Sequence, residues 1–400
     1  MNYINNIDMK QIYILLVTIC AIAFTACSDD DNTKDPIDDD NGGEEMITAV
    51  YEPEYEWDLE LNIGTFKEGE NITIAWGDGG VSEFKSFADT DSWGWDRDEE
   101  LHYAIGQGVV EHKYPNYNAH TITIKGKIKE FYCYDVLTKL DVSKCPAIVN
   151  LYCGDNNISS LDVSKCTALT KLECYANNLT SLDISKNTAL THLRCSTNYI
   201  SSLDVSKCTA LTYLECHENK LTSLGIGKNT ALTNLYCGDN YISSLDVSKC
   251  TALTELSCGS NNLTSLDITK NTALTELSCG GNNLTSLDVS KNTALTKLWC
   301  HHNNLTSLDV TNNIMLIDLS CGNNNLTSLD VSKNTALTYL HCENNNLSAS
   351  ALNKIFNDLP QGKKWNEYGQ KKQSTISIGN NPGTNTCDKS IAENKGWIVW

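Results

Sequence analysis

Cysteines recur at a fixed interval in this chain, and such thiols can form disulfides, ligate zinc or pack as small apolar groups. Ten of them, from Cys153 to Cys342, follow one another every 21 residues, and Cys133 precedes the first by one residue less. No two cysteines have the two-residue separation of a zinc-binding pair. In stacked repeats their side chains would lie parallel and about 4.8 Å apart, which suits packed thiols better than disulfides.

A second group of cysteines, Cys145, Cys166, Cys208 and Cys250, shares its place in the repeat with asparagines. Only Cys145 and Cys166 fall in adjacent repeats, so they are the one pair for which we consider a disulfide. Apart from the adjacent His301 and His302, the histidines of residues 128–347 fall in separate repeats, and they occupy outward positions, so the sequence predicts no metal site and no cofactor.

Two carboxylates, Glu255 and Glu276, occupy equivalent places in adjacent repeats, at a spacing close to that of a retaining glycosidase pair. Catalytic carboxylates need different environments to separate their pKa values, and these two have the same serine and glycine neighbours. The chain also lacks a phosphate-binding loop, a nucleophile elbow and a His-Glu-x-x-His motif. We therefore expect no enzymatic activity.

Three columns of residues vary while the rest of the repeat is constant: those three before, one before and one after each cysteine. They are rich in Tyr, Trp, His and Arg interleaved with charge, which is the composition of binding hot spots. The alternative is neutral drift at unconstrained surface positions. The candidate ligand-binding residues are Tyr132, Tyr134, Tyr152, Glu173, Tyr175, Arg194, Tyr213, Glu215, Tyr236, Trp299, His301, Tyr339 and His341.

The constant positions of the repeat predict the elements that hold these columns. Around Cys174, the apolar positions are Leu172, Leu179, Leu182 and Ile184, and an asparagine follows each of the ten cysteines by three residues. The alternation in Leu-x-Cys predicts a short strand with Leu and Cys facing inward. Asparagine amides can satisfy the backbone where each strand turns a corner. Aspartate and lysine columns follow, and their charges neutralise one another.

The pattern LxxLxCxxNxL resembles leucine-rich repeats, with cysteine in place of an inner leucine. The resemblance covers residues 128–347, about 11 repeats of 21 residues. It implies a solenoid with a parallel β-sheet on its concave face, where the three variable columns would lie. It also implies a binding function, because leucine-rich repeats mostly bind proteins.

The N-terminus has the pattern of an export signal. An apolar run from Ile12 to Phe24 is too short to span a bilayer and ends in small residues before Cys27. Residues 1–26 resemble a bacterial lipoprotein signal peptide, which implies lipidation of Cys27; the alternative is an ordinary secretory signal. Residues 27–45 hold nine acidic residues, one lysine and almost nothing apolar, which predicts a disordered tether. This acidic run resembles a signal for the outer face of the outer membrane, and the alternative is a periplasmic protein on a solvated linker.

Residues 46–127 lack the 21-residue period and contain short segments typical of β-strands, separated by turn residues. Candidate strands are Trp57–Ile63, Asn71–Trp76, Val81–Phe84, Val109–Lys113 and His120–Lys125. The region resembles PKD-like immunoglobulin-type β-sandwiches, with Asp78 as a turn former in Gly-Asp-Gly. Trp93 and Trp95 lie in a long insertion, either as a binding tip or folded back as core.

The solenoid needs a cover at each end. No linker separates residues 46–127 from the first repeat, so we expect this β-sandwich to form the N-terminal cap. Residues 348–400 should form a small α/β C-terminal cap. Helical spacing over Ser350–Leu359 ends at Pro360, and a strand is expected over Thr375–Ile378.

The net charge of −20 disfavours nucleic acid as a partner. The sequence as a whole predicts a mainly β, lipid-anchored protein that is exposed on the cell surface as an outer-membrane lipoprotein. It would bind a protein of a host or neighbouring cell through its concave face and touch the membrane through the lipid anchor only. Two alternatives stay open: capture of a glycan for a nutrient-uptake system, and a structural spacer.

Overall fold

The computed structural model describes residues 45–52, 59–65, 70–85, 109–134, 137–363 and 373–400. Within these ranges the protein is mainly β, with two sheets and few helices. No helix in them is both long and apolar enough to cross a membrane. The predicted signal peptide, Cys27, the acidic tether, Trp93 and Trp95 lie outside the described residues.

The first sheet has five strands in the order β4-β3-β6-β1-β8. Its members are β1 (Met46–Tyr51), β3 (Asn71–Ala75), β4 (Val81–Lys85), β6 (His120–Lys125) and β8 (Leu137–Lys144). The pairs within it are antiparallel, and alternate residues of each of β1, β3 and β6 are buried. Three of the expected strands are present here to within a residue, whereas β1 and β8 were not foreseen.

The second sheet joins the N-terminal strands to the repeats. Its first strands are β5 (Val109–His112), β2 (Leu59–Thr65) and β7 (Ile128–Tyr132), and β2 pairs antiparallel with both of the others. Strand β7 then pairs in parallel with β9 (Asn150–Tyr152), the first of the regular repeat strands. The edge of β7 that faces away from the repeats is therefore covered by β2.

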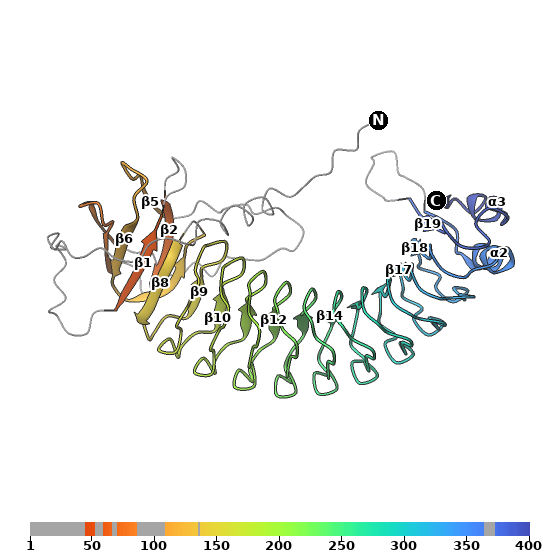
Figure 1. Ribbon diagram of the computed structural model, residues 1–400, viewed down its shortest axis with the longest axis horizontal. Helices are drawn as coiled ribbons and strands as arrows, with labels where there is room; N and C mark the ends of the chain where they lie inside the picture. The colour runs from red at the N-terminus through yellow and green to blue at the C-terminus, as the bar shows by residue number, and fades with distance from the viewer. Residues whose placement is uncertain (1–44, 53–58, 66–69, 86–108, 135–136, 364–372) are drawn as a thin grey trace, which may run out of the picture. The chain divides into compact units, whose positions relative to one another are not determined.

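The repeat strands are three residues long and pair in parallel, in register at intervals of 21 residues. In Figure 1 they follow the inner side of an arc. The later strands are β10 (Lys171–Glu173), β11 (His192–Arg194), β12 (Tyr213–Glu215), β13 (Asn234–Tyr236), β14 (Glu255–Ser257), β15 (Glu276–Ser278), β16 (Lys297–Trp299), β17 (Asp318–Ser320) and β18 (Tyr339–His341).

Each repeat strand stops at its cysteine because the chain turns two residues later. The residue at that place has a positive φ, for example 48° at Ala176 and 51° at Asp239. The asparagine after it holds the turn: Asn240 accepts a hydrogen bond from the N–H of Leu221 at 2.9 Å and donates to the carbonyl of Cys216 at 3.0 Å. Both partners belong to the preceding repeat, so this ladder also ties the turns together. The expected ladder is present.

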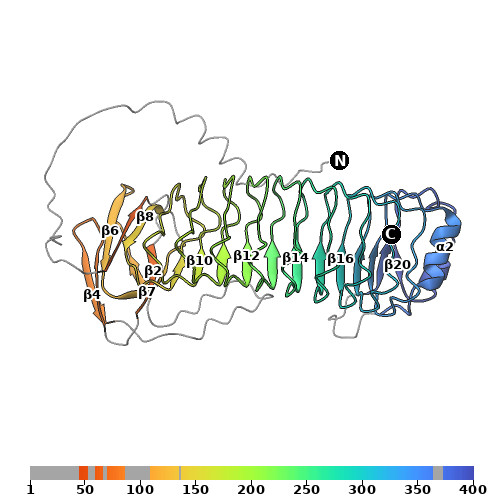
Figure 2. The ribbon, with the colours of Figure 1, turned by 90° about the horizontal axis from the view of Figure 1, so that it is seen from below.

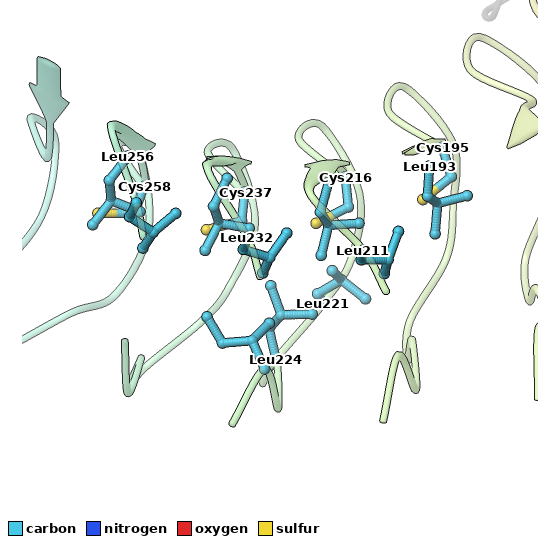
Figure 3. Packing of buried hydrophobic residues seen from close by; sticks show 14 of the residues in the cluster. Leu193, Cys195, Leu211, Cys216, Leu221, Leu224, Leu232, Cys237, Leu256 and Cys258 are labelled. Atoms are coloured by element: carbon cyan, nitrogen blue, oxygen red, sulfur yellow. The ribbon is translucent and has the colours of Figure 1, made fainter. Parts of the chain in front are cut away.

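The core of the array consists of leucine and cysteine side chains in columns. Leu193, Cys195, Leu235 and Cys237 are fully buried, and Figure 3 shows the thiols and leucines pointing to the same side of successive strands. All the cysteines of the inner column are free thiols, as packing of small apolar groups requires. Burial raises the pKa of the Cys258 thiol to about 12, so these sulfurs stay protonated and unreactive.

The second cysteine column is equally buried and unbridged. Cys145 and Cys166, the pair considered for a disulfide, are both free, and the Cys166 Sγ lies 3.3 Å from the carbonyl of Val142. Asparagines at this place, such as Asn187, donate to two carbonyls of the preceding repeat at 2.8 and 2.9 Å. Cysteine and asparagine can alternate here because both satisfy backbone oxygens.

The aspartate column forms local turns on the outside. The Asp183 carboxylate accepts from the N–H of Ser185 at 2.9 Å, and this bond lowers the pKa of Asp183, with Lys186 contributing less. Among the described residues, no group of three or more His, Cys, Asp or Glu side chains is placed to hold a metal ion.

The C-terminal residues continue the sheet and cover its end. After β18 come α2 (Ala349–Asp358), β19 (Thr375–Ser377), α3 (Ser390–Glu393) and β20 (Ile398–Val399). Strand β19 pairs in parallel with β18. Helix α2 begins at Ser348, whose hydroxyl accepts from the N–H of Ala351, and it buries Leu352, Ile355 and Phe356. Figure 2 shows α2 across the end of the array.

Candidate functional site

The candidate residues come from the strand face of the repeat sheet and from the position just after each strand. Residues three and one before each cysteine are the first and last residues of a strand, and the leucine between them is buried. Most of the candidates are half-buried, with His341 exposed. Tyr152 and Glu173 are more enclosed than expected, with exposed fractions of 2% and 1%. Their neighbours on the same face cover them.

Packing between neighbouring repeats limits the size of the residue that directly follows each cysteine, which sequence analysis missed. From Tyr175 onward, every large side chain there follows a glycine or serine one repeat earlier, because the large side chain leans over the preceding repeat. A Cβ on Gly154 would meet the Tyr175 ring at 2.6 Å, and one on Gly280 would meet His301 at 2.8 Å. Much of the variation in this column is therefore internal packing.

The first part of the strand face is closed by aromatic stacking. The rings of Tyr132 and Tyr152 stack with centroids 4.1 Å apart. The Tyr132 hydroxyl donates to Glu130 at 3.1 Å, and the Asn150 amide donates to the same carboxylate at 2.9 Å. Tyr134 is half-buried at the edge of this group. Burial raises the pKa of each of these tyrosines, so all stay neutral.

An ion-pair network follows, centred on Arg194. Its guanidinium donates to Glu215 at 2.9 Å and to Glu173 at 3.2 Å, and its Cζ lies 4.7 Å from the Tyr175 ring centroid. Burial raises the pKa of Glu173 to about 7 although Arg194 opposes the shift. Arg194 also pairs with Glu215, and the pKa of that carboxyl is lowered despite its burial. His192 lies 3.6 Å from Glu173, and burial lowers its pKa to about 4.

Two more tyrosines extend this network along the sheet. The Tyr213 ring stacks on His192 with centroids 4.2 Å apart, and its hydroxyl donates to Glu215 at 2.8 Å. The Tyr236 hydroxyl donates to Glu255 in the next repeat. The strand face from β7 to β13 is therefore a rigid, internally paired surface rather than a row of independent side chains.

The last part of the strand face is more open. Trp299, His301 and Tyr339 are half-buried and His341 is exposed. Their polar contacts are longer than those of the first part: Lys297 Nζ lies 6.0 Å from the Trp299 ring centroid, and His301 Nδ1 lies 3.3 Å from the Ser320 hydroxyl. His341 Nδ1 lies 3.9 Å from the Glu343 carboxylate. The pair Lys297–Glu276, at 2.9 Å, has both side chains more than a third exposed.

Small residues separate the two parts. Ser257 and Ser278 occupy the ends of β14 and β15, and glycines follow their cysteines. Glu255 and Glu276, the two carboxylates considered above as a possible catalytic pair, begin these strands and lie side by side in register. Each has its own partner: Tyr236 donates to Glu255, and Lys297 pairs with Glu276. On this part of the face the carboxylates are paired, while Trp299 and Tyr339 keep part of their ring surface exposed.

Sequence analysis missed several residues of this face. His192, Ser196, Glu130 and Glu255 complete the networks around the predicted side chains. All four lie in the three variable columns but were not among the candidate ligand-binding residues. Reading the columns across adjacent repeats, rather than one at a time, would have placed each Glu beside its Tyr or Arg.

The three-residue parallel strands, the leucine and cysteine columns and the asparagine ladder define a leucine-rich-repeat solenoid of about 12 turns of 21 residues. The chain is similar to the functional domain of InlJ from Listeria monocytogenes, with 35% identity and a TM-score of 0.59 over 67% of this chain. It spans 58% of that InlJ chain, which includes a cysteine ladder. No family model and no curated protein matches it.

Two other solved structures show the same fold at lower identity. A leucine-rich-repeat protein of Leptospira interrogans has 20% identity and a TM-score of 0.54, over 65% of this chain and 74% of the other. The internalin InlF of Listeria monocytogenes has 21% identity and a TM-score of 0.53, over 63% of this chain and 74% of the other.

Proposed function

We propose that this protein binds a protein partner through the strand face of its leucine-rich repeats, in adhesion or a related interaction. The observation that carries this proposal is the contrast between the two parts of the face. The first part satisfies its own polar groups, whereas in the last part His341 is exposed and the polar contacts of Trp299 and His301 are longer. Aromatic side chains on a rigid sheet lose little entropy when they become hot spots.

The paired part contributes in a different way. Tyr132 stacks on Tyr152, and Arg194 lies over Tyr175. Because these side chains are already ordered, little conformational entropy is lost when a partner binds them. They supply shape and a rigid flank, and the open part supplies the anchoring contacts. Glycan capture stays the second candidate, favoured only by the partly exposed rings of Trp299 and Tyr339.

The strand-face proposal predicts a sharp loss of binding in one double variant. Replacing Trp299 and Tyr339 together by alanine should weaken binding by about a hundredfold or more, since each removes a ring from the open part. Capture of proteins from a defined panel of cell-surface proteins, beside a glycan array, measures the effect and separates the two ligand classes. Tyr199→Ala with Tyr241→Ala is the matched control, because these exposed rings lie after the turn, away from the strand face. Equal losses in both double variants would contradict the proposal.

We also propose that Cys27 carries a lipid and that residues 27–45 form a tether, which would present the protein at the outer membrane surface. The N-terminal strands would form a PKD-like β-sandwich that caps the first repeat; the pairing of β2 with β7 supports this. Metabolic labelling with an alkyne fatty acid should mark the wild-type protein and leave Cys27→Ser unlabelled. Labelling of Cys27→Ser to the wild-type level would count against the anchor.

A further inference from the structure

One turn of the solenoid departs from the others at its outward positions. Residues 312, 314, 315 and 317 are Asn, Ile, Met and Ile, where every other turn between Lys165 and Thr338 has Lys, Thr, Ala and Thr. We call these four residues the 312 turn. The inward positions of the same repeat keep the usual types and are buried, namely Leu308, Val310, Asn313, Leu316, Leu319 and Cys321. The departure is therefore confined to the surface, where packing does not demand it.

The three apolar side chains of the 312 turn are exposed together. The exposed fractions are 54% for Ile314, 53% for Met315 and 41% for Ile317. Single exposed apolar residues are ordinary, but three in four positions of one turn form a patch of the kind found at binding sites.

Ile317 also interrupts a ladder of hydrogen bonds. At its place in other repeats a threonine hydroxyl donates to the carbonyl one repeat back, as Thr296 does to Thr275 at 3.1 Å and Thr338 to Ile317 at 3.2 Å. Isoleucine has no hydroxyl to make this bond. Having Ile317 in place of threonine therefore removes a stabilising hydrogen bond and exposes an apolar side chain.

The 312 turn lacks the positive charge that the other turns carry. Asp309 has no lysine three residues later, because Asn312 stands there. Hydrogen bonds from Thr311 lower the pKa of Asp309, while Asp330 and Asp288 act in the opposite direction. At Asp288 and Asp330, by contrast, Lys291 and Lys333 contribute to the lowered pKa. Asp318 follows Ile317 directly and begins β17 between Lys297 of β16 and Tyr339 of β18.

We propose that the 312 turn binds a segment of a protein partner that carries aliphatic or aromatic side chains next to lysine or arginine. The apolar side chains would contact Ile314, Met315 and Ile317, and the basic groups would face Asp309 and Asp318. The proposal rests on the proposed function and deepens it, because Ile317 adjoins the strand face and makes the patch its continuation.

The test uses short labelled peptides in which leucines alternate with arginines, with the full-length protein and fluorescence anisotropy. Replacing the leucines by serines, or the arginines by glutamates, should weaken binding by at least about tenfold. The variant Ile314→Thr/Met315→Ala/Ile317→Thr should lose about as much and should fold, since it restores the residues of the other turns. Asn312→Lys should weaken binding by about threefold through charge alone.

Several outcomes would overturn the inference. They are equal binding of the three peptide series, or wild-type affinity in the triple variant. If sedimentation shows a wild-type dimer that the triple variant abolishes, the occupant is a second copy of this chain instead. Trp299→Ala/Tyr339→Ala separates the two proposals: if it alone abolishes peptide binding, the 312 turn is excluded and the strand face stands. If only the triple variant does so, the peptide binds the 312 turn, and the strand face is judged by its own test with Trp299→Ala/Tyr339→Ala and the protein panel.

Discussion

Replacing Asn282 with alanine should lower the free energy of unfolding by about 3 kcal/mol. The Asn282 side chain accepts from the N–H of Leu263 at 3.0 Å and donates to the carbonyls of Cys258 and Cys279 at 3.0 and 3.1 Å. Alanine leaves the buried N–H of Leu263 without this partner, and an unsatisfied buried group costs about 1–3 kcal/mol. The two carbonyls each lose one of two donors and keep the amides of Asn261 and Asn303. The midpoint of urea unfolding measures the loss.

Asn283 provides the matched control, because it is the next residue in the chain and its side chain is exposed. Asn283→Ala should change stability by less than about 0.5 kcal/mol. Amide hydrogen exchange at Leu263 gives a local reading, and it should accelerate in Asn282→Ala alone. Similar stabilities for the two variants would show that the ladder does not hold the turns together.

Because the solenoid is nearly one-dimensional, the position of Asn282→Ala along the array matters as much as the stability that it removes. Each turn contacts only its neighbours, so a weak interface in the middle separates the array into two cooperative blocks. The N-terminal block would keep the sheet that includes β2, and the C-terminal block would keep α2. Unfolding of Asn282→Ala should therefore become broader as well as easier.

The repeat architecture could be predicted from the sequence because the same packing and hydrogen-bonding interactions recur in every 21-residue unit. Each Leu-x-Cys-x-x-Asn unit forms the same short strand and the same turn. The structure places the Leu, Cys and Asn columns where the period predicts. Strand β8 was not predicted, because its place in the first repeat corresponds to a turn region elsewhere. It is a strand because β1, about ninety residues earlier, pairs with it. Periodicity carries no information about such a partner.

The strand face could be predicted only in part for a similar reason. The period identifies which columns point away from the core, but the pairing along a column depends on neighbouring turns. Glu173 is enclosed because Arg194 and His192 follow in the next repeat, and Gly154 is small because Tyr175 leans over it. Both facts are visible only when adjacent repeats are compared as neighbours in a sheet.

Arg194→Leu should be the most damaging change on the strand face, lowering the free energy of unfolding by about 3 kcal/mol at pH 8. Arg194 is the cation between Glu173 and Glu215, and the Glu173 side chain is only 1% exposed. Leucine keeps most of the packing but leaves Glu173 buried with an uncompensated charge. Lys297→Leu is the control, because the exposed pair Lys297–Glu276 should be worth less than about 1 kcal/mol.

The effect of Arg194→Leu should depend on pH in a definite direction. The folded pKa of Glu173 is about 7, above its ordinary 4.5, so the folded state binds more protons than the unfolded state between these values. Stability from this group therefore rises as pH falls from 7 towards 4.5. Without Arg194 the folded pKa moves higher still, so the deficit is largest above pH 7 and shrinks as Glu173 becomes neutral. Adding Glu173→Gln to Arg194→Leu should recover most of the loss at pH 8 and little at pH 5. A deficit that is the same at both pH values would mean that Glu173 carries no buried charge.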